Sequence, residues 1–96
     1  MPYIARGDRP KLDPLIDQLA SEIKAIADKQ DYDGAFAGLL NYAMTRLLLK
    51  VAPEKRYWVI AIMTGVVHNV LDEFYRRYGV PYEDQQIQKN GDVYGG

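Results

Sequence analysis

Cysteine is absent from the 96-residue sequence, which excludes both a disulfide scaffold and a metal site built on thiolates. A charge imbalance is absent too, because 12 basic residues stand against 13 acidic ones and the formal net charge is -1. Proteins that bind extended nucleic acid usually concentrate positive charge. We therefore expect no extended nucleic-acid partner.

Long apolar segments are also missing. The longest uncharged run, residues 57–71, is shorter than the roughly 20 residues of a membrane span and contains Thr64, His68 and Asn69. The opening "MPYIARGDRPK" lacks the apolar core of a signal peptide. The sequence thus predicts a cytoplasmic protein with no membrane partner.

No stretch has the spacing of a phosphate loop, a nucleophile elbow or a zinc site. The acidic residues also lack the paired E-x-x-E spacing that would hold magnesium between helices, since Asp72 and Glu73 are adjacent and face different directions. We therefore expect neither a metal site nor a cofactor, and an enzyme is the less favoured interpretation.

Apolar residues at three- and four-residue spacing predict an all-α fold in a single domain over residues 1–96. The architecture that we expect is a small bundle of three main helices plus a short C-terminal helix, completed by oligomerisation. The predicted helices cover about residues 14–29, 34–51, 54–78 and 81–90.

Local signals set these boundaries. Asp13 before Pro14 indicates the first helix start, and Asp33 is the predicted N-cap of the second helix, which Pro53 ends. The third helix is expected to begin near Glu54 and to close at Gly79 in a left-handed conformation.

The second and third helices are apolar on nearly all sides, so one short neighbour cannot cover them. Gly38 and Gly65 lie inside these helices, where glycine is best explained by the close approach of another backbone. We predict a homodimer or higher homo-oligomer, the alternative being a monomer wrapped by its first helix and its tail. The predicted interface residues are Tyr42, Leu49, Trp58, Ile62, Gly65 and Asn69.

Two polar groups are candidates for binding a protein partner or a small anionic ligand. Asn41, Thr45 and Arg46 interrupt the apolar second helix, and the planar guanidinium of Arg46 suits an anion. A structural network that fixes helix register is the alternative interpretation of these three residues. Aromatic and basic residues at the chain's C-terminal end complete the predicted binding set with Tyr75, Arg76 and Tyr82.

His68 and Asp72 are four residues apart, so they share one side of the third helix. An imidazole beside a carboxylate can act as a general base, which makes a small enzyme the alternative function. A histidine whose partner is merely structural is the more common arrangement, and no serine or cysteine nucleophile is placed nearby. We therefore predict no catalytic residue.

The tail "PYEDQQIQKNGDVYGG" has the signals of a short helix that begins at Pro81 and ends at Asn90 and Gly91. Its sparse apolar edge includes Tyr82, Ile87 and Tyr94. We expect an ordered clasp through about Tyr94 that packs on the third helix or on a neighbouring subunit.

The segments "NYAMTRLLL", "DEFYRRYGVPYED" and "NGDVY", with the opening "MPYI" and "DRPKLDPLIDQLA", are similar to a family of small uncharacterised all-helical proteins of bacteria and phages. This resemblance covers most of the chain and implies an accessory protein of phage or mobile-element origin, with no known activity.

The leading hypothesis is therefore a non-enzymatic, homo-oligomeric binding protein that presents a helical surface or an inter-subunit pocket to its partner. Besides a small enzyme, a purely structural assembly component is the other alternative.

Overall fold

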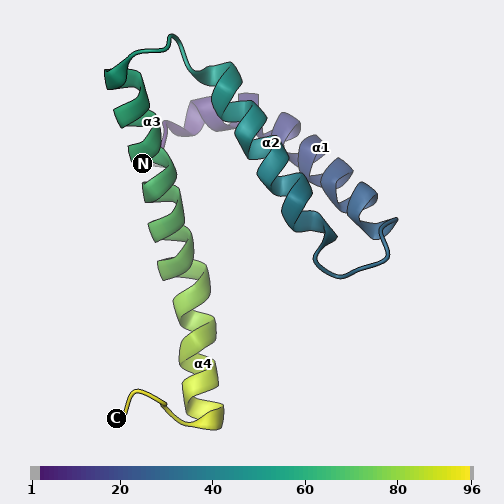
Figure 1. The fold of residues 1–96 in the computed structure, drawn as a ribbon, viewed down its shortest axis with the longest axis vertical. Coiled ribbons are helices and arrows are strands. Elements are labelled where there is room, and N and C mark those ends of the chain that lie inside the picture. Colours follow the sequence, from purple (N-terminus) through teal and green to yellow (C-terminus); the bar gives the residue numbers. More distant parts are fainter. Residues whose placement is uncertain (1–2, 96) are drawn as a thin grey trace. The chain divides into compact units, whose positions relative to one another are not determined.

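The computed structural model describes residues 3–95, and every regular element in this range is a helix, which confirms the predicted all-α class. A short 3-10 turn, η1 (Arg6–Asp8), leads into α1 (Arg9–Asp28), and α2 (Ala35–Val51), α3 (Tyr57–Phe74), η2 (Tyr75–Gly79) and α4 (Val80–Asn90) follow (Figure 1). Within residues 3–95 no helix is both long and apolar enough to cross a membrane.

The chain forms two compact units, one from Tyr3 to Val59 and the other from Ile60 onward. In the first unit α1 and α2 pack against each other as a helical hairpin (Figure 1). The second unit contains most of α3 together with η2 and α4. That residues 1–96 act as a single domain stays a prediction.

The predicted start of the first helix near Pro14 is wrong, because α1 begins at Arg9. Pro10, near the helix start, needs no N–H partner there and sets the first turn. Asp13 is consequently not an N-cap, and Pro14 lies inside the helix, where it cannot donate to the carbonyl of Pro10.

The N-cap of α2 is Gly34, with no side-chain cap, so the predicted capping by Asp33 is also wrong. The end at Val51 agrees with the prediction. Ala52 has the extended conformation (ψ 119°) that a residue before proline favours, and the helix therefore stops ahead of Pro53. The chain becomes helical again at Tyr57, three residues later than the expected start at Glu54.

Apolar side chains one turn apart mark where α2 meets α1. Ala35 is the buried residue of α2, at 5% exposure, and Leu39 and Ala43 follow at four-residue intervals and are half-buried. On α1, Ile23 and Ala27 are the half-buried residues. The hairpin thus rests on a narrow line of contact near its turn, and little apolar surface is covered along the rest of α2.

From Tyr57 to Asn90 the chain is helical without interruption, so the predicted break at Gly79 is wrong (Figure 1). Gly79 is right-handed (φ -77°, ψ -49°) instead of left-handed. The junction is a π turn in which the N–H of Val80 donates to the carbonyl of Tyr75. Proline fits the first turn of a helix, so Pro81, the second residue of α4, does not end the helical path.

The predicted helix end is confirmed, because α4 stops at Asn90 and Gly91 takes a positive φ of 91°. A tail that clasps α3 is not observed, since α4 continues the direction of the preceding helix instead of folding back. Val93 and Tyr94 are 91% and 96% exposed. Packing of this tail on a neighbouring subunit stays a prediction.

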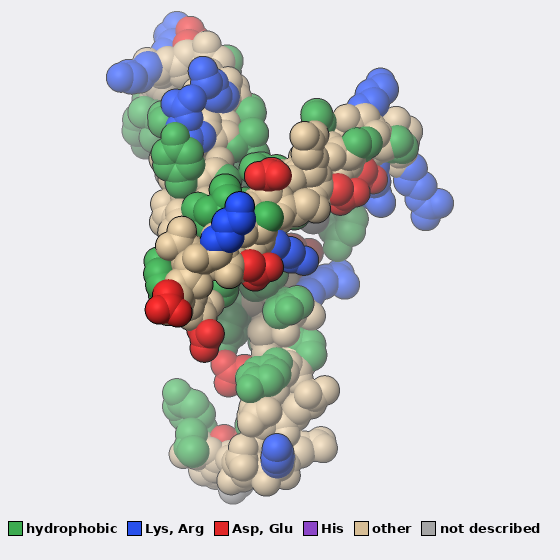
Figure 2. Space-filling model, turned by 90° about the vertical axis from the view of Figure 1, so that its right-hand side faces the viewer, with side chains coloured by type: hydrophobic (Ala, Val, Ile, Leu, Met, Phe, Trp, Pro, Cys, Tyr) green, Lys and Arg blue, Asp and Glu red, His purple; other side chains and the backbone are tan. Residues whose placement is uncertain are grey.

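Apolar side chains are exposed over most of the described chain, as Figure 2 shows in green for one face. Among residues 3–95 only Ala35 and Val59 are buried, the latter at 3% exposure. Folded domains ordinarily bury many of their large aliphatic residues, because burial of apolar surface is the main driving force for folding. Each unit therefore presents apolar faces that nothing in that unit covers.

Candidate functional site

Asn41 and Thr45 lie one turn apart on α2, and the Thr45 hydroxyl donates a 3.3 Å hydrogen bond to Oδ1 of Asn41. Together with Ala37, Gly38 and Tyr42 they line a shallow depression on the helix surface. The two predicted binding residues thus form one polar spot beside small side chains. Both are exposed, so the spot is accessible to a ligand or to another protein chain.

Arg46 does not join this spot. It follows Thr45 directly, so its side chain leaves the helix about 100° further round. Within residues 3–95 the Arg46 guanidinium makes neither a hydrogen bond nor an ion pair, although it has five N–H donors. It is an exposed cation able to bind an anionic group.

Tyr75 and Glu83 are joined across the π turn by a hydrogen bond of 2.8 Å from the Tyr75 hydroxyl to Oε1 of Glu83. In an ordinary α-helix two turns take about seven residues, so residues eight apart do not stand directly above each other. The π turn takes in one extra residue and thereby aligns the pair. Sequence reasoning on α-helical spacing accordingly missed Glu83.

The pKa of the Tyr75 phenol is raised above its ordinary value of 10.0. The first cause is the hydrogen bond that the neutral phenol donates to Glu83, and the second is the negative charge of Glu83, which disfavours a phenolate beside it. Tyr75 is therefore held in its neutral, donating form.

Arg76 forms an ion pair with Glu73, and Nε of Arg77 lies 3.7 Å from the same carboxylate. Two cations thus share one acid within a helical turn, which favours the local helix. Tyr82 is exposed on α4 and has no side-chain bond within residues 3–95. Of the two arginines in the predicted binding set, Arg76 is paired with a carboxylate and Arg46 is not.

The predicted interface residues are all on α2 and α3, and the large ones are exposed. Tyr42 and Leu49 lie on α2, where a side chain at Gly38 would meet nothing within 4 Å. On α3 a β-carbon at Gly65 would also meet nothing, and Trp58 is 51% exposed. Within its own unit no neighbouring helix approaches either glycine, so the close contact that we predicted with another backbone stays a prediction.

His68 and Asp72 make no side-chain hydrogen bond within residues 3–95. The four-residue spacing places them on one side of α3, but nothing there forms a nucleophile–base pair. Among the same residues no group of three or more histidine or acidic side chains could hold a metal ion.

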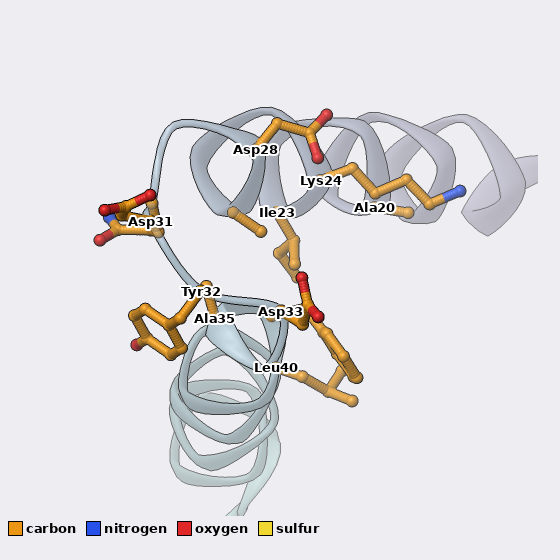
Figure 3. A pocket seen from close by; sticks show the side chains of 12 residues that line it. Ala20, Ile23, Lys24, Asp28, Asp31, Tyr32, Asp33, Ala35 and Leu40 are labelled. Carbon is orange, nitrogen blue, oxygen red and sulfur yellow. The ribbon is translucent and has the colours of Figure 1, made fainter.

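A pocket of about 710 Å³ lies between α1 and α2 near their connecting turn. Figure 3 shows Lys24, Asp28 and Ile23 of α1 on one side, and Ala35 and Leu40 of α2 on the other. Asp31, Tyr32 and Asp33 of the turn complete the lining. Sequence analysis missed this pocket, whose signal is the close spacing of Asp28, Asp31 and Asp33 between two amphipathic helices.

One comparison with known proteins identifies a family for this chain, and none gives an activity. Neither the curated proteins nor the solved structures include one that matches this chain. The family model described as "Domain of unknown function (DUF6899)" matches residues 1–93, which is nearly the whole sequence. The chain therefore belongs to the DUF6899 family of uncharacterised proteins.

Proposed function

We propose that this protein is a non-enzymatic, homo-oligomeric binding protein of the cytoplasm, an accessory protein of phage or mobile-element origin. It presents a helical surface or an inter-subunit pocket to a protein or to a small anionic, nucleotide-like ligand. The observation that carries the proposal is the exposed apolar surface of α3, where Ile62 and Val70 are both open to solvent. Exposed apolar surface of this extent is typical of an interaction site.

The case for a second copy is based on how α3 is built. Ile60, Val67 and Leu71 lie on one side of it, while Trp58 and Ile62 lie on the opposite side, and all five are exposed. A single packing neighbour covers one side of a helix. Small all-helical chains commonly complete their cores by association, and a symmetric dimer uses the same patch on both copies.

The oligomer is tested by light scattering coupled to size-exclusion chromatography. The expected mass is at least twice the 11.0 kDa of the chain. Leu49→Glu and Ile62→Glu should each shift the protein towards the monomer, because an acidic group would be buried without a partner. Gln18→Glu, on the polar side of α1, is the matched control and should not. A monomeric wild type would refute the proposal.

The ligand is tested by thermal unfolding with adenine and guanine nucleotides. A nucleotide at 100 times its dissociation constant adds about 2.7 kcal/mol to the free energy of unfolding. Arg46→Ala should abolish this gain, whereas Lys89→Ala, at an exposed lysine of α4, should retain it. If no nucleotide shifts the melting temperature, the anionic-ligand part of the proposal fails and a protein partner is left.

A further inference from the structure

We propose that two copies of the α1–α2 hairpin pack face to face and head to tail, so that the turn of each lies over the open end of the other. This inference rests on the proposal that the chain assembles with itself. It adds a particular surface, a particular orientation and a role for charged residues at the two ends of the hairpin. All of these residues belong to the unit from Tyr3 to Val59.

The apolar part of this surface is a stripe along α2, next to the pocket. Its members are spaced three or four residues apart, so they share one side of the helix. All of them are exposed in the described chain. The stripe consists of Phe36, Leu40, Met44, Leu47 and Val51.

The stripe and the pocket are continuous, because Phe36 and Leu40 belong to both. Opposite them Ala20, Ile23 and Ala27 form the α1 side of the pocket, and Ile16 extends the apolar side of α1 further from the turn. Two helices with adjoining apolar sides form half of a four-helix bundle, and a second hairpin supplies the other half.

The two ends of the hairpin carry opposite charge. The acidic turn, residues 28–33, has three aspartates and one lysine and therefore a net charge of -2. The basic end, residues 50–56, has two lysines, one arginine and one glutamate and a net charge of +2. The 17 residues of α2 separate these ends by about 25 Å.

A two-fold axis between two hairpins makes their charged ends complementary to each other. In a head-to-tail pair each acidic turn meets the partner's basic end, so both contacts are attractive. Turn-to-turn pairing would bring the acidic turns together and the basic ends together. The uncharged run of residues 57–71 offers no cation to the acidic turn, so charge complementarity favours the basic end of a second hairpin. The charges set the orientation, and the apolar stripe supplies the buried area.

Cross-linking tests the orientation directly, because the native chain has no cysteine. Asp31→Cys and Lys55→Cys proteins are prepared separately, mixed at the wild-type assembly concentration and treated with a short bis-maleimide. The mixture should give covalent dimers, and each variant alone should not. Asp17→Cys, on the polar side of α1, is the control and should cross-link with neither variant.

The outcomes separate the two proposals. Covalent dimers of Asp31→Cys with itself would show turn-to-turn pairing and overturn the inference. An oligomer by light scattering that cross-links in neither combination would also overturn it, because the surface is then covered by something else, and the proposed function would stand. A monomeric wild type would contradict both the proposed function and the head-to-tail pairing.

Charge reversal provides a second measurement that needs no cysteine. Asp31→Lys with Asp33→Lys should raise the dissociation constant at least tenfold at low salt, and so should Lys50→Glu with Lys55→Glu. Mixing the two double variants should restore wild-type affinity. Equal affinities of wild type and both double variants would contradict the head-to-tail pairing, and circular dichroism of each variant verifies that it is folded.

Discussion

The ring of Tyr75 lies against the backbone of Gly79, so closely that a β-carbon added at Gly79 would be 2.9 Å from Cδ2 of the tyrosine. Such an approach is shorter than a normal carbon–carbon contact. The glycine is therefore required for space and not for a left-handed turn. It allows the phenol to lie along the π turn and reach Glu83.

Gly79→Ala is expected to displace the Tyr75 ring and break its hydrogen bond to Glu83. At a helical glycine with free space, alanine adds up to about 1 kcal/mol to the free energy of unfolding, and we expect this gain to be lost at Gly79. Chemical denaturation measures the difference. The contact between Tyr75 and Gly79 would be contradicted if Gly79→Ala raised the free energy of unfolding by the full amount and left the titration of Tyr75 unchanged.

The phenol of Tyr75 should titrate above the ordinary tyrosine pKa of 10.0, because Glu83 both accepts its hydrogen bond and repels the phenolate. Because the pKa is higher in the folded than in the unfolded state, the hydrogen bond to Glu83 stabilises the fold fully below a pH of about 10. This stabilisation is lost as the pH rises through the pKa of the folded protein. The pKa is measured from phenolate absorbance as a function of pH. The difference between the wild type and Tyr75→Phe isolates Tyr75 from the other tyrosines. Glu83→Gln should lower this pKa, and an unchanged value would show that the carboxylate has no influence.

Much of the helical pattern can be predicted from sequence, because amphipathic spacing and strong terminators are local. Pro53 ended α2 as expected, and Gly91 ended α4 with a positive φ of 91°. Gly79 was misjudged because a glycine before Pro81 has two explanations, a helix stop or close packing, and only the position of Tyr75 decides between them.

The site was harder to predict than the helices. The pair Tyr75 and Glu83 depends on the extra residue of a π turn, which no α-helical projection includes. The pocket depends on how α1 and α2 meet, a tertiary property that neither helix carries alone. Asn41 and Thr45 could be paired in advance, because they are one turn apart on the same helix.

Trp58 is the only tryptophan of the chain and is half exposed, so it reports on association without a label. If it lies at the proposed interface, its fluorescence should shift to longer wavelength as the protein is diluted through its dissociation constant. The Ile62→Glu protein, altered one turn from Trp58 on the same side of α3, should already have the long-wavelength spectrum at high concentration. A spectrum that is independent of concentration in an assembling wild type would place Trp58 outside the interface.

Deletion of residues 81–96 should lower the melting temperature, because it removes α4 and leaves Tyr75 without its acceptor. A loss of 1 kcal/mol corresponds to about 4–8 °C for a chain of this size, and we expect a fall of that order. Deletion of residues 92–96 alone is the control. It should change little, since Val93 and Tyr94 are almost fully exposed, and equal effects of both deletions would contradict this account.

With only Ala35 and Val59 buried inside the described chain, folding in the proposed assembly depends on how many copies are present. At cellular concentrations below the dissociation constant of the assembly, the newly made chain is accessible to proteases. At higher concentrations the assembled chain is protected from them. The cellular abundance of this protein would then rise more steeply than its rate of synthesis. A gene with this property responds sharply to dosage without any dedicated regulator.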